Sequence, residues 1–442
     1  RYECRGNGMN VVIIGAGYVG LVSGACFAEF GAYVTCIDTD GQKIQALGEN
    51  KIPIYEPGLA ELVKHNAQAG RLKFCTSLAS AVPHADIVFI AVGTPSHELD
   101  GQADLQYIHA AAREVAEHLQ NYTVVVNKST VPVGTAREVQ LIIKQARPSA
   151  DFDVASNPEF LREGSAIADF LRPDRVVLGL ESARAESLLR ELYRPLNLIE
   201  APILVTTPES AEIIKYASNA FLATKISFIN EMAQLCEATG ADIHSVAKGM
   251  GLDRRIGRKF LHAGPGYGGS CFPKDTRALA GMASTHGLSS HIVKATMEVN
   301  AAQKGRMIAK IRQALGGSEA GQVIAVLGLT FKPETDDMRD APALNILPAL
   351  SDNGAVIKAH DPAGMAAARP LLPDTIQYAQ DIDQAILGAD AIVIMTEWNQ
   401  YRGMDLAKIK SVMKGKVFID LRNIYERDLI EGHGFDYCCV GR

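Results

Sequence analysis

The chain has 442 residues, of which 47% are hydrophobic and 21% are charged, and its formal net charge is −6 at pH 7. This composition is typical of a globular protein with a large core, and the length predicts about two or three domains. Acidic and basic residues are interspersed, so no basic face is indicated for a nucleic acid or an anionic membrane. No apolar run reaches the roughly eighteen residues of a transmembrane helix. We therefore expect a multidomain protein that acts on small molecules.

The eight cysteines are scattered and form no Cys-x-x-Cys pair. Neighbouring Cys438 and Cys439 are unsuited to bridging distant segments. The pattern is typical of reduced thiols, which predicts a cytoplasmic protein. Residues 1–8 match no structural element and Met9 directly precedes an apolar run, so we interpret residues 1–8 as a remnant ahead of the natural start.

The first part of the chain alternates buried strands with helices. An apolar run from Asn10, a glycine turn, a helix over 21–30 and a strand over 33–37 predict a βαβ unit. Further strands are predicted at 87–92, 123–127, 153–156 and 175–180, with helices at 105–118 and 133–146. The pattern predicts an α/β domain over residues 9–200 with a doubly wound parallel sheet.

The middle of the chain is predicted to be helical. Apolar residues recur at helical spacing from Pro208 to Gly240, which indicates one long helix. Helical patterns follow at 243–250, 278–286 and 292–315, so we expect a central helical domain over residues 201–315 that also forms a homodimer interface.

A second α/β domain is predicted over residues 316–442. It begins with a glycine-rich linker, and strand-like runs follow at 323–327, 356–360, 391–396 and 417–420. The fold class is therefore α/β, with two Rossmann-like doubly wound domains joined by a long central helix. The glycine motif of the first domain is absent from the second, so the two domains need not bind the same ligand.

A glycine turn follows the first strand. Gly15, Gly17 and Gly20 form a G-x-G-x-x-G motif between the predicted strand and helix. Gly15 permits a tight turn, Gly17 permits close approach of a pyrophosphate, and Gly20 permits close packing of the helix. The N-terminus of the helix attracts phosphate. Asp38 ends the second strand, where a carboxylate binds ribose hydroxyls and repels a 2′-phosphate. We predict NAD as cofactor, bound by this acid and by the turn Gly15, Gly17, Tyr18, Val19 and Gly20, with Thr94 and Thr130 on loops along the same edge.

A second loop concentrates four glycines ahead of Cys271 and places Lys274 and Asp275 behind it. Such a loop can leave a thiol accessible, and nearby lysines favour the thiolate that acts as nucleophile. The other cysteines within predicted helices and strands are interpreted as buried and structural. On the long helix, Lys215 and Asn219 are i, i+4 neighbours and share a face, although spacing alone allows a solvent-facing pair equally well.

Eight stretches of the sequence resemble the UDP-glucose/GDP-mannose dehydrogenases, from about Met9 to Tyr425. They are GAGYVG (15–20), EPGL (56–59), KSTVPVGT (128–135), SNPEFLREG (156–164), AEIIKYASNAFLATKISFINE (211–231), RIGRKFL (255–261), GPGYGGSCFPKD (264–275) and LGLTFKPETDDMR (327–339). The resemblance implies an N-terminal NAD domain, a helical dimerisation region and a C-terminal domain that holds uridine diphosphate. It also implies a four-electron oxidation of a sugar nucleotide through a thiohemiacetal and a thioester on Cys271.

The resemblance also implies roles for individual residues. Lys215 would stabilise an oxyanion at C6, Asn219 would donate a hydrogen bond to it, and Asp275 would act on water. Glu159 and Thr130 would assist proton movement, and the general base stays open between Glu159, Asp275 and a water molecule. The remaining implied cofactor contacts are Glu163, Lys274 and Arg339.

The implied substrate is UDP-glucose, with GDP-mannose as the alternative. Arg255 would reach into the site of a neighbouring subunit. The positions matching substrate contacts are Phe160, Leu161, Arg162, Glu163, Lys215, Asn219, Arg255, Phe260, Leu261, Tyr267, Gly268, Cys271, Phe331, Lys332 and Arg422. Lys128 and Thr330 lie in matching motifs without an assigned role, and no metal ligand set is predicted.

Three further alternatives are tested by the chemistry. A UDP-N-acetylhexosamine dehydrogenase is disfavoured because such relatives tend to carry histidine where Ser270 stands and to lack the pair Lys274 and Asp275. A single-hydride 2-hydroxy-acid dehydrogenase would leave Cys271 without a role, and a dinucleotide-sensing scaffold would not need the cysteine, lysine, asparagine and aspartate together.

Overall fold

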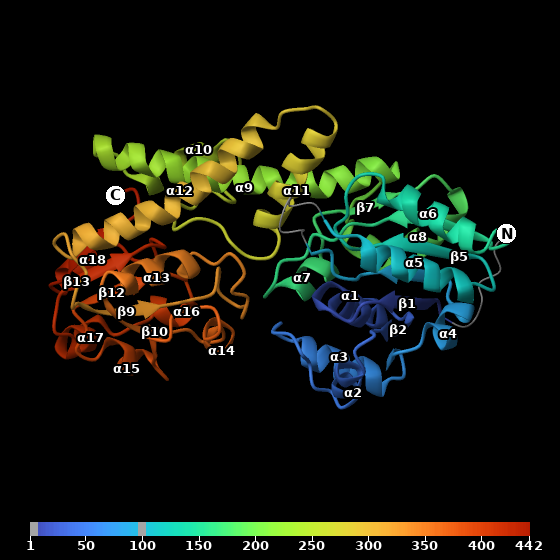
Figure 1. Ribbon diagram of the computed structural model, residues 1–442, viewed down its shortest axis with the longest axis horizontal. Coiled ribbons are helices and arrows are strands. Elements are labelled where there is room, and N and C mark those ends of the chain that lie inside the picture. The colour runs from blue at the N-terminus through green and yellow to red at the C-terminus, as the bar shows by residue number, and fades with distance from the viewer. Residues whose placement is uncertain (1–7, 96–102) are drawn as a thin grey trace. The chain divides into compact units, whose positions relative to one another are not determined.

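The computed structural model describes residues 8–95 and 103–442, so most of the expected remnant at residues 1–8 lies outside the described part. The chain divides into two compact units, Arg1–Ala217 and Ser218–Arg442. Each unit contains one sheet with helices on both of its faces (Figure 1). The predicted α/β class with two Rossmann-like domains and a long central helix is confirmed.

The first unit is built on an eight-stranded sheet in the order β3-β2-β1-β4-β5-β6-β7-β8. All neighbouring strands are parallel except β6 and β7. The strands are β1 (Asn10–Ile14), β2 (Tyr33–Ile37), β3 (Leu72–Cys75), β4 (Ile87–Ile90), β5 (Thr123–Asn127), β6 (Phe152–Ser156), β7 (Val176–Gly179) and β8 (Ile203–Thr206). The helices are α1 (Tyr18–Glu29), α2 (Gly41–Gly48), α3 (Leu59–Gln68), α4 (Leu78–Ala81), α5 (Gln106–His118), α6 (Thr135–Ala146), α7 (Ala166–Leu171) and α8 (Ala183–Leu192), with 3₁₀ turns at Val82–His84 and Arg194–Ile199.

Both faces of this sheet are buried. Val11 and Ile13 of β1 pack into a core with α1, α3, α7 and α8, while Val12 and Ile14 pack into another core with α4, α5 and α6. Successive residues of a strand point to opposite faces, so a continuous apolar run is required when helices cover both faces. This requirement explains why β1, β4 and β5 were predicted from apolar runs alone.

The long helix α9 (Pro208–Thr239) begins in the first unit and ends in the second. Proline is favoured in the first turn of a helix, because its missing N–H would have no helical partner there. Gly240 follows the last turn with φ +75°, a conformation that glycine adopts without steric cost. The start and end of the predicted helix over 208–240 therefore follow from two residues.

The second unit contains a six-stranded parallel sheet in the order β11-β10-β9-β12-β13-β14. The strands are β9 (Val323–Leu327), β10 (Val356–His360), β11 (Gln377–Tyr378), β12 (Ala391–Ile394), β13 (Val417–Asp420) and β14 (Asp436–Cys439). The helices are α10 (Ile243–Leu252), α11 (Phe272–Thr285), α12 (His291–Ala314), α13 (Ala343–Asp352), α14 (Met365–Ala368), α15 (Ile382–Ile386), α16 (Asn399–Arg402), α17 (Leu406–Val412) and α18 (Arg427–Gly432). One face of the sheet packs with α9, α12 and α13, and the other packs with α15, α17 and α18.

Helix α11 begins six residues before the predicted start at Ala278, so the prediction was wrong there. The first residue of the helix is Phe272 and the N-cap residue is Cys271. Pro273 lies in the first helical turn, where proline is tolerated. The glycines and the proline around the cysteine were interpreted as one loop, although the loop ends at the cysteine.

The two sheets repeat one strand order, which the sequence analysis did not detect. The order β11-β10-β9-β12-β13-β14 matches β3-β2-β1-β4-β5-β6 position by position. Gly15 and Gly328 each follow the first strand with positive φ, and their N–H groups donate to Ile37 O at 2.7 Å and to His360 O at 2.8 Å. This glycine and the aspartate after the next strand recur in both domains, while the rest of the glycine motif is absent from the second.

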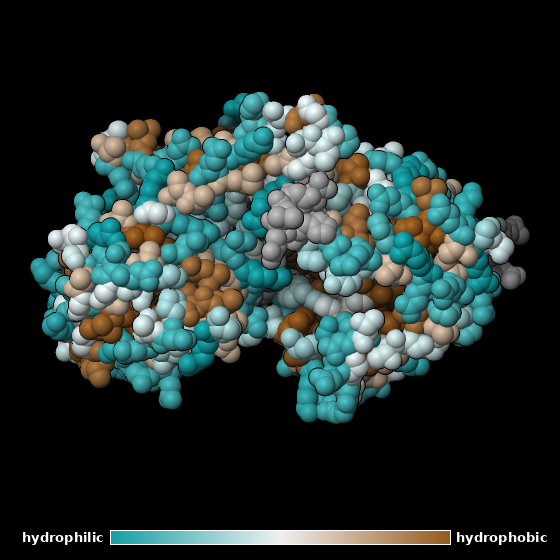
Figure 2. Space-filling view, in the orientation of Figure 1, coloured by the Kyte–Doolittle hydropathy of each residue, from teal (hydrophilic) through white to brown (hydrophobic). Residues whose placement is uncertain are grey.

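Figure 2 shows hydrophilic residues over much of the visible surface of each unit, with hydrophobic residues in separate groups. Within residues 8–95 and 103–442, no helix is long and apolar enough to cross a membrane.

Candidate active site

The turn after β1 has the form expected for a dinucleotide. Gly15 has φ +100°, and a Cβ there would lie 2.6 Å from Ala91 O, while a Cβ on Gly20 would lie 1.8 Å from Gly15 O. These two glycines are therefore required by the fold. A Cβ on Gly17 would meet no atom within 4 Å, and the N-terminus of α1 has no side-chain cap. The turn thus leaves room at Gly17 and donors at α1 for a pyrophosphate, which fits NAD.

Asp38 lies directly after β2 and faces the same turn. Its carboxylate accepts hydrogen bonds from the N–H groups of Ala16 and Asp40, both at 3.0 Å, and from Lys43 Nζ at 2.9 Å. Burial alone would raise the pKa of Asp38, but these donors hold the pKa below its ordinary value. Lys43 was missed by the sequence analysis because its contact depends on the bend between β2 and α2.

Glu56 of the EPGL stretch joins α1 to the segment after β6. The Tyr18 hydroxyl donates to the Glu56 carboxylate, which also accepts the N–H groups of Gly164 at 2.6 Å and Ala166 at 2.8 Å. Burial, and then the bond to Glu56, raise the pKa of Tyr18. The glutamate therefore orders the residues beside Glu163, a role that no local pattern indicated.

The loops after β4 and β5 meet at the carboxyl edge of the sheet. Thr94 Oγ1 donates to the Thr130 carbonyl at 3.1 Å, so the structure brings these two predicted residues together. Glu212 of α9 accepts the N–H groups of Gly134 and Ala136 at 2.7 and 2.9 Å. A carboxylate at the N-terminus of α6 is favoured by the helix dipole, and here it fixes the loop that carries Thr130.

Lys215 and Glu159 form a buried ion pair. Lys215 Nζ lies 2.9 Å from Glu159 Oε1 and donates to the Glu159 carbonyl at 2.6 Å, and only 3% of Lys215 is exposed. The N–H of Leu161 donates to Glu159 Oε2 at 2.6 Å. Burial alone would raise the pKa of Glu159, but the adjacent ammonium of Lys215 holds it below its ordinary value. The solvent-facing interpretation of Lys215 is excluded.

The aromatic ring of Phe160 lies beside the same ammonium. Lys215 Nζ is 5.3 Å from the ring centroid, and the guanidinium carbon of Arg175 is 3.5 Å from it. The ring therefore contacts two cations favourably. Arg162, by contrast, is paired with Asp169 at 2.6 Å.

Cys271 is the N-cap residue of α11 and is half-buried. Its sulfur lies 3.5 Å from Ser270 Oγ. The N-terminus of a helix favours negative charge, so this position supports a thiolate. The sequence analysis did not include this contribution of the helix, because it did not predict that α11 starts at Phe272.

Asp275 lies one turn into α11 and is fully buried. Its two carboxylate oxygens bond different partners, Asn219 Nδ2 at 2.6 Å and Lys274 Nζ at 2.6 Å. The structure thus brings together three predicted residues within the second unit: Lys274 and Asp275 on the helix that Cys271 caps, and Asn219 on another helix. Asn219 belongs to α9, as Lys215 does, four residues earlier.

The glycines before Cys271 are required for packing against the protein itself. A Cβ on Gly268 would lie 2.3 Å from Asp340 O, and a Cβ on Gly269 would lie 2.7 Å from the Phe331 ring. The sequence analysis had interpreted the glycine loop as leaving the thiol accessible. The loop is further held by Asn300, whose side chain accepts the Tyr267 N–H at 2.8 Å and donates to the Tyr267 carbonyl at 3.0 Å.

The segment after β9 carries the predicted residues Phe331 and Lys332. Arg422 donates to the Phe331 carbonyl at 2.8 Å and pairs with Glu397 at 3.1 Å, so it is no solvated surface charge. Thr330, which had no assigned role, has a structural one. Its N–H and its hydroxyl both donate to the Asp361 carboxylate at 3.1 Å. The indole N–H of Trp398 points to the same oxygen at 3.3 Å.

The other predicted substrate and cofactor contacts described next lie in the second unit. Leu261 and Tyr267 are buried, and Phe260 has φ +65° with its ring 6.0 Å from that of Phe272. Arg255 and Arg339 each pair with an aspartate two residues away. Each pair joins residues of one loop, and both arginine side chains stay largely exposed.

The remaining thiols contrast with Cys271. Burial raises the pKa of Cys26 and of Cys36 to about 12, which keeps both protonated.

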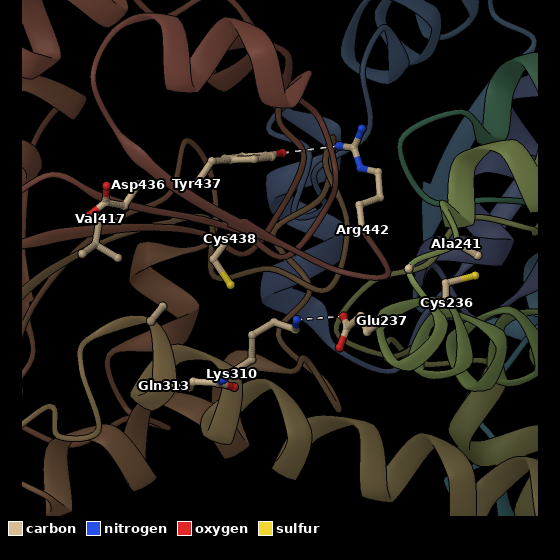
Figure 3. Close-up of a pocket in the computed structure, with 12 residues that line it drawn as sticks. Cys236, Glu237, Ala241, Lys310, Gln313, Val417, Asp436, Tyr437, Cys438 and Arg442 are labelled. Atoms are coloured by element: carbon tan, nitrogen blue, oxygen red, sulfur yellow. Dashed lines mark hydrogen bonds and ion pairs between the residues drawn. The ribbon is translucent and has the colours of Figure 1, made fainter.

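Cys236 and Cys438 line a cavity of about 540 Å³ between α9, α12 and β14 (Figure 3). Lys310 and Glu237, which form an ion pair at 2.7 Å, both line this cavity. Within the described residues, no three His, Cys, Asp or Glu side chains gather as a metal site.

The glycine turn and the acid after β2 are the features of a dinucleotide-binding domain, which places the chain in the class of NAD-binding proteins. Comparison with known proteins agrees with this class. Three domain descriptions of one family match in order: the NAD binding domain at residues 9–197, the central domain at 209–302 and the UDP binding domain at 325–427. The chain belongs to the UDP-glucose/GDP-mannose dehydrogenase family.

Individual relatives are similar over nearly their whole length. A UDP-glucose 6-dehydrogenase of Rhizobium meliloti is 55% identical, over 98% of this chain and 100% of that protein. The structure of a UDP-glucose dehydrogenase from Pyrobaculum islandicum has a TM-score of 0.88 at 41% identity, covering 96% of each chain. A GDP-mannose dehydrogenase structure from Pseudomonas aeruginosa has a TM-score of 0.55 at 31% identity, covering 95% of this chain and 98% of that one. The predicted family, enzyme class and NAD cofactor are confirmed.

The ion pair of Glu159 with Lys215 leads to a stability prediction. Glu159→Leu leaves a buried ammonium without its carboxylate, and we expect it to lower the free energy of unfolding by about 3–5 kcal/mol. The double variant Glu159→Leu, Lys215→Met removes both charges and should recover most of that loss. Urea unfolding of the full chain, followed by far-UV circular dichroism, measures both values. Equal losses in the single and double variants would contradict the pairing.

Proposed function

We propose that the chain catalyses the NAD-dependent oxidation of the C6 alcohol of UDP-glucose to the carboxylate of UDP-glucuronate, with Cys271 as covalent nucleophile. The observation that carries the proposal is the position of Cys271 at the N-terminus of α11, one turn before Asp275. A dehydrogenase that stops at an aldehyde needs no such thiol. The 55% identity to a UDP-glucose 6-dehydrogenase supports the substrate, and the 31% identity to a GDP-mannose dehydrogenase gives the alternative less weight.

NAD, when bound, would supply the hydride acceptor for each of the two oxidations. In this proposal the Cys271 thiolate adds to the aldehyde carbon between them, and the resulting thiohemiacetal again carries a hydrogen that can leave as hydride. Water then cleaves the thioester, which releases the acid and restores the thiol. The balance is one alcohol, one water and two NAD⁺ consumed for one carboxylate, two NADH and three protons.

The charged and polar groups divide into two proposed roles. The Lys215 ammonium and the Asn219 amide stabilise negative charge on the C6 oxygen. Proton transfer is assigned to Glu159, Thr130 and Asp275, where the carboxylates are held by Lys215 and by Lys274 respectively. Which of these carboxylates, or water, serves as the base in each step stays open in this proposal.

Binding contacts are proposed in the same way. Lys332 and Arg422 suit the diphosphate of the substrate, because both are cationic and lie on loops at the carboxyl ends of β9 and β13. Gly17 and Asp38 suit the pyrophosphate and the adenosine ribose of NAD. The proposed cofactor contacts also include Glu163, Lys274 and Arg339, and Arg255 is proposed to reach a neighbouring subunit.

The first test is the amount of NADH formed when UDP-glucose is consumed to completion. We expect two equivalents and UDP-glucuronate as product. One equivalent with an aldehyde product would remove the proposed role of Cys271. Turnover of GDP-mannose without turnover of UDP-glucose would keep the chemistry and refute the substrate.

A matched pair of cysteine variants completes this test. Cys271→Ser would form an ester in place of the thioester, so steady-state release of acid should fall by roughly a hundredfold or more. Cys75→Ser changes another half-buried thiol, in the first unit, and should leave turnover unchanged. Normal turnover in Cys271→Ser would exclude covalent catalysis by this residue.

The glycine turn gives a second matched pair. Gly17→Ala meets no protein atom, so it should leave the melting temperature unchanged while weakening NAD binding roughly tenfold or more. Gly20→Ala collides with Gly15 O and should lower the melting temperature. Thermal scans and NAD titration by calorimetry measure the two effects. Native NAD affinity in Gly17→Ala would refute the proposed approach of the pyrophosphate.

We also propose that the chain forms a homodimer through α9. Phe221, Phe228 and Leu235 are spaced by seven residues along α9 and are 67%, 43% and 56% exposed. Such a row of apolar side chains fits a second helix. Light scattering should give twice the chain mass, and Phe228→Glu should reduce it to the chain mass, while Leu198→Glu, at a 90% exposed position in the first unit, should not. A monomeric native chain would refute the proposal.

A further inference from the structure

Lys128 is a buried cation without a function in the reaction described above. It directly follows β5, and only 4% of it is exposed. Its ammonium donates to Asn157 Oδ1 at 2.9 Å and to the Tyr193 hydroxyl at 3.3 Å. It also lies 5.7 and 5.9 Å from the ring centroids of Phe170 and Tyr193. The hydrogen-bond partners found for this ammonium are therefore neutral groups.

The neutral partners are themselves held in place around the lysine. Asn157 donates through Nδ2 to the Val177 carbonyl at 2.9 Å, which turns Oδ1 toward Lys128. The Tyr193 hydroxyl donates to the same Oδ1 at 2.6 Å. Burying a charge without a counter-charge is costly, and replacing such a group with an apolar one often stabilises a fold. A cluster built to keep an uncompensated charge thus calls for a reason other than stability.

Strand pairing places this charge behind the ion pair of Glu159. Asn127 and Ser156 are partners in the β5·β6 register, so Lys128 and Asn157 leave the sheet side by side. Asn157 lies two residues before Glu159, whose carboxylate is bonded to Lys215. The buried set Lys128, Glu159 and Lys215 contains two cations and one anion.

The titratable groups that face Lys128 are Glu159, Lys215 and Tyr193. Burial lowers the pKa of Lys128 to about 8, attraction to Glu159 opposes this shift, and repulsion from Lys215 adds to it. Burial raises the pKa of Tyr193 far above neutral pH, so its hydroxyl stays uncharged. Lys128 thus loses its charge as pH rises through about 8.

We propose that Lys128 is a positioning residue that supplies the excess positive charge of this cluster. With Lys128 charged, the set Lys128, Glu159 and Lys215 keeps a net positive field toward the substrate oxygen as negative charge develops on that oxygen. The inference rests on the proposed oxidation, in which Lys215 faces that oxygen. Lys128 need not touch the substrate, because a fixed charge in a dry site acts over several ångströms.

Two substitutions remove the excess charge by different routes. Lys128→Met deletes the ammonium, and Asn157→Asp neutralises it in place with a nearly isosteric carboxylate. We expect either change to lower kcat roughly ten- to a hundredfold at pH 7, with little change in the KM for UDP-glucose. Lys128→Arg keeps the charge and should retain most of the rate, as should Tyr193→Phe, which removes only a neutral hydrogen-bond partner.

The pH profile separates this role from a merely structural one. Native kcat should fall as pH rises through about 8, where Lys128 loses its proton. Lys128→Met should lack this alkaline limb, and Lys128→Arg should shift it to higher pH, because arginine stays protonated. The melting temperature of Lys128→Met should match or exceed that of the native chain. A structural lysine predicts instead a lower melting temperature and an unchanged profile.

The outcomes also separate this inference from the proposed function. Fewer than two equivalents of NADH from UDP-glucose and from GDP-mannose alike would refute the proposed oxidation, and the inference with it. A native chain that yields two equivalents, with kcat retained in both Lys128→Met and Asn157→Asp, overturns the inference alone. An equal loss of kcat in Tyr193→Phe and Lys128→Met would also overturn it, because hydrogen bonding rather than charge would then be responsible.

Discussion

The candidate site in the first unit depends on one electrostatic constraint: a charge taken out of water must be met by another charge or by dipoles. Lys215 meets it through the carboxylate of Glu159, at 2.9 Å. Parallel strands end at one edge of a sheet, so the residues after β5 and β6 are brought together there. The same constraint in the second unit makes Asp275 bond Asn219 and Lys274 with separate oxygens.

Much of the fold was predictable because burial on both faces of a parallel sheet requires apolar runs. The predicted strands at 33–37, 123–127, 323–327 and 356–360 match β2, β5, β9 and β10 residue by residue. The tail after Asp428 was uninformative, although it holds β14. A short edge strand such as β14 is defined by pairing with β13, a contact that its own residues do not encode.

The candidate site was predictable where chemistry is local and not where it depends on distant contacts. The glycine turn, Asp38 and the cysteine loop each lie within one stretch of sequence. Glu56, by contrast, acts on Gly164, more than a hundred residues later, and Asp361 acts on Thr330 of a preceding strand end. The start of α11 at Phe272 was missed although a local signal for it exists. Pro273 is typical of a first helical turn, but the glycines before Cys271 favoured the interpretation of the whole stretch as a loop.

Trp398 is the single tryptophan of the chain, and its indole N–H lies 3.3 Å from both Thr330 Oγ1 and Asp361 Oδ2. Its ring therefore rests against the segment that carries Phe331 and Lys332. Intrinsic fluorescence excited at the indole band has one source in this protein. That source sits within the C-terminal domain, so emission serves as a label-free optical reporter of changes around that segment, without an introduced dye.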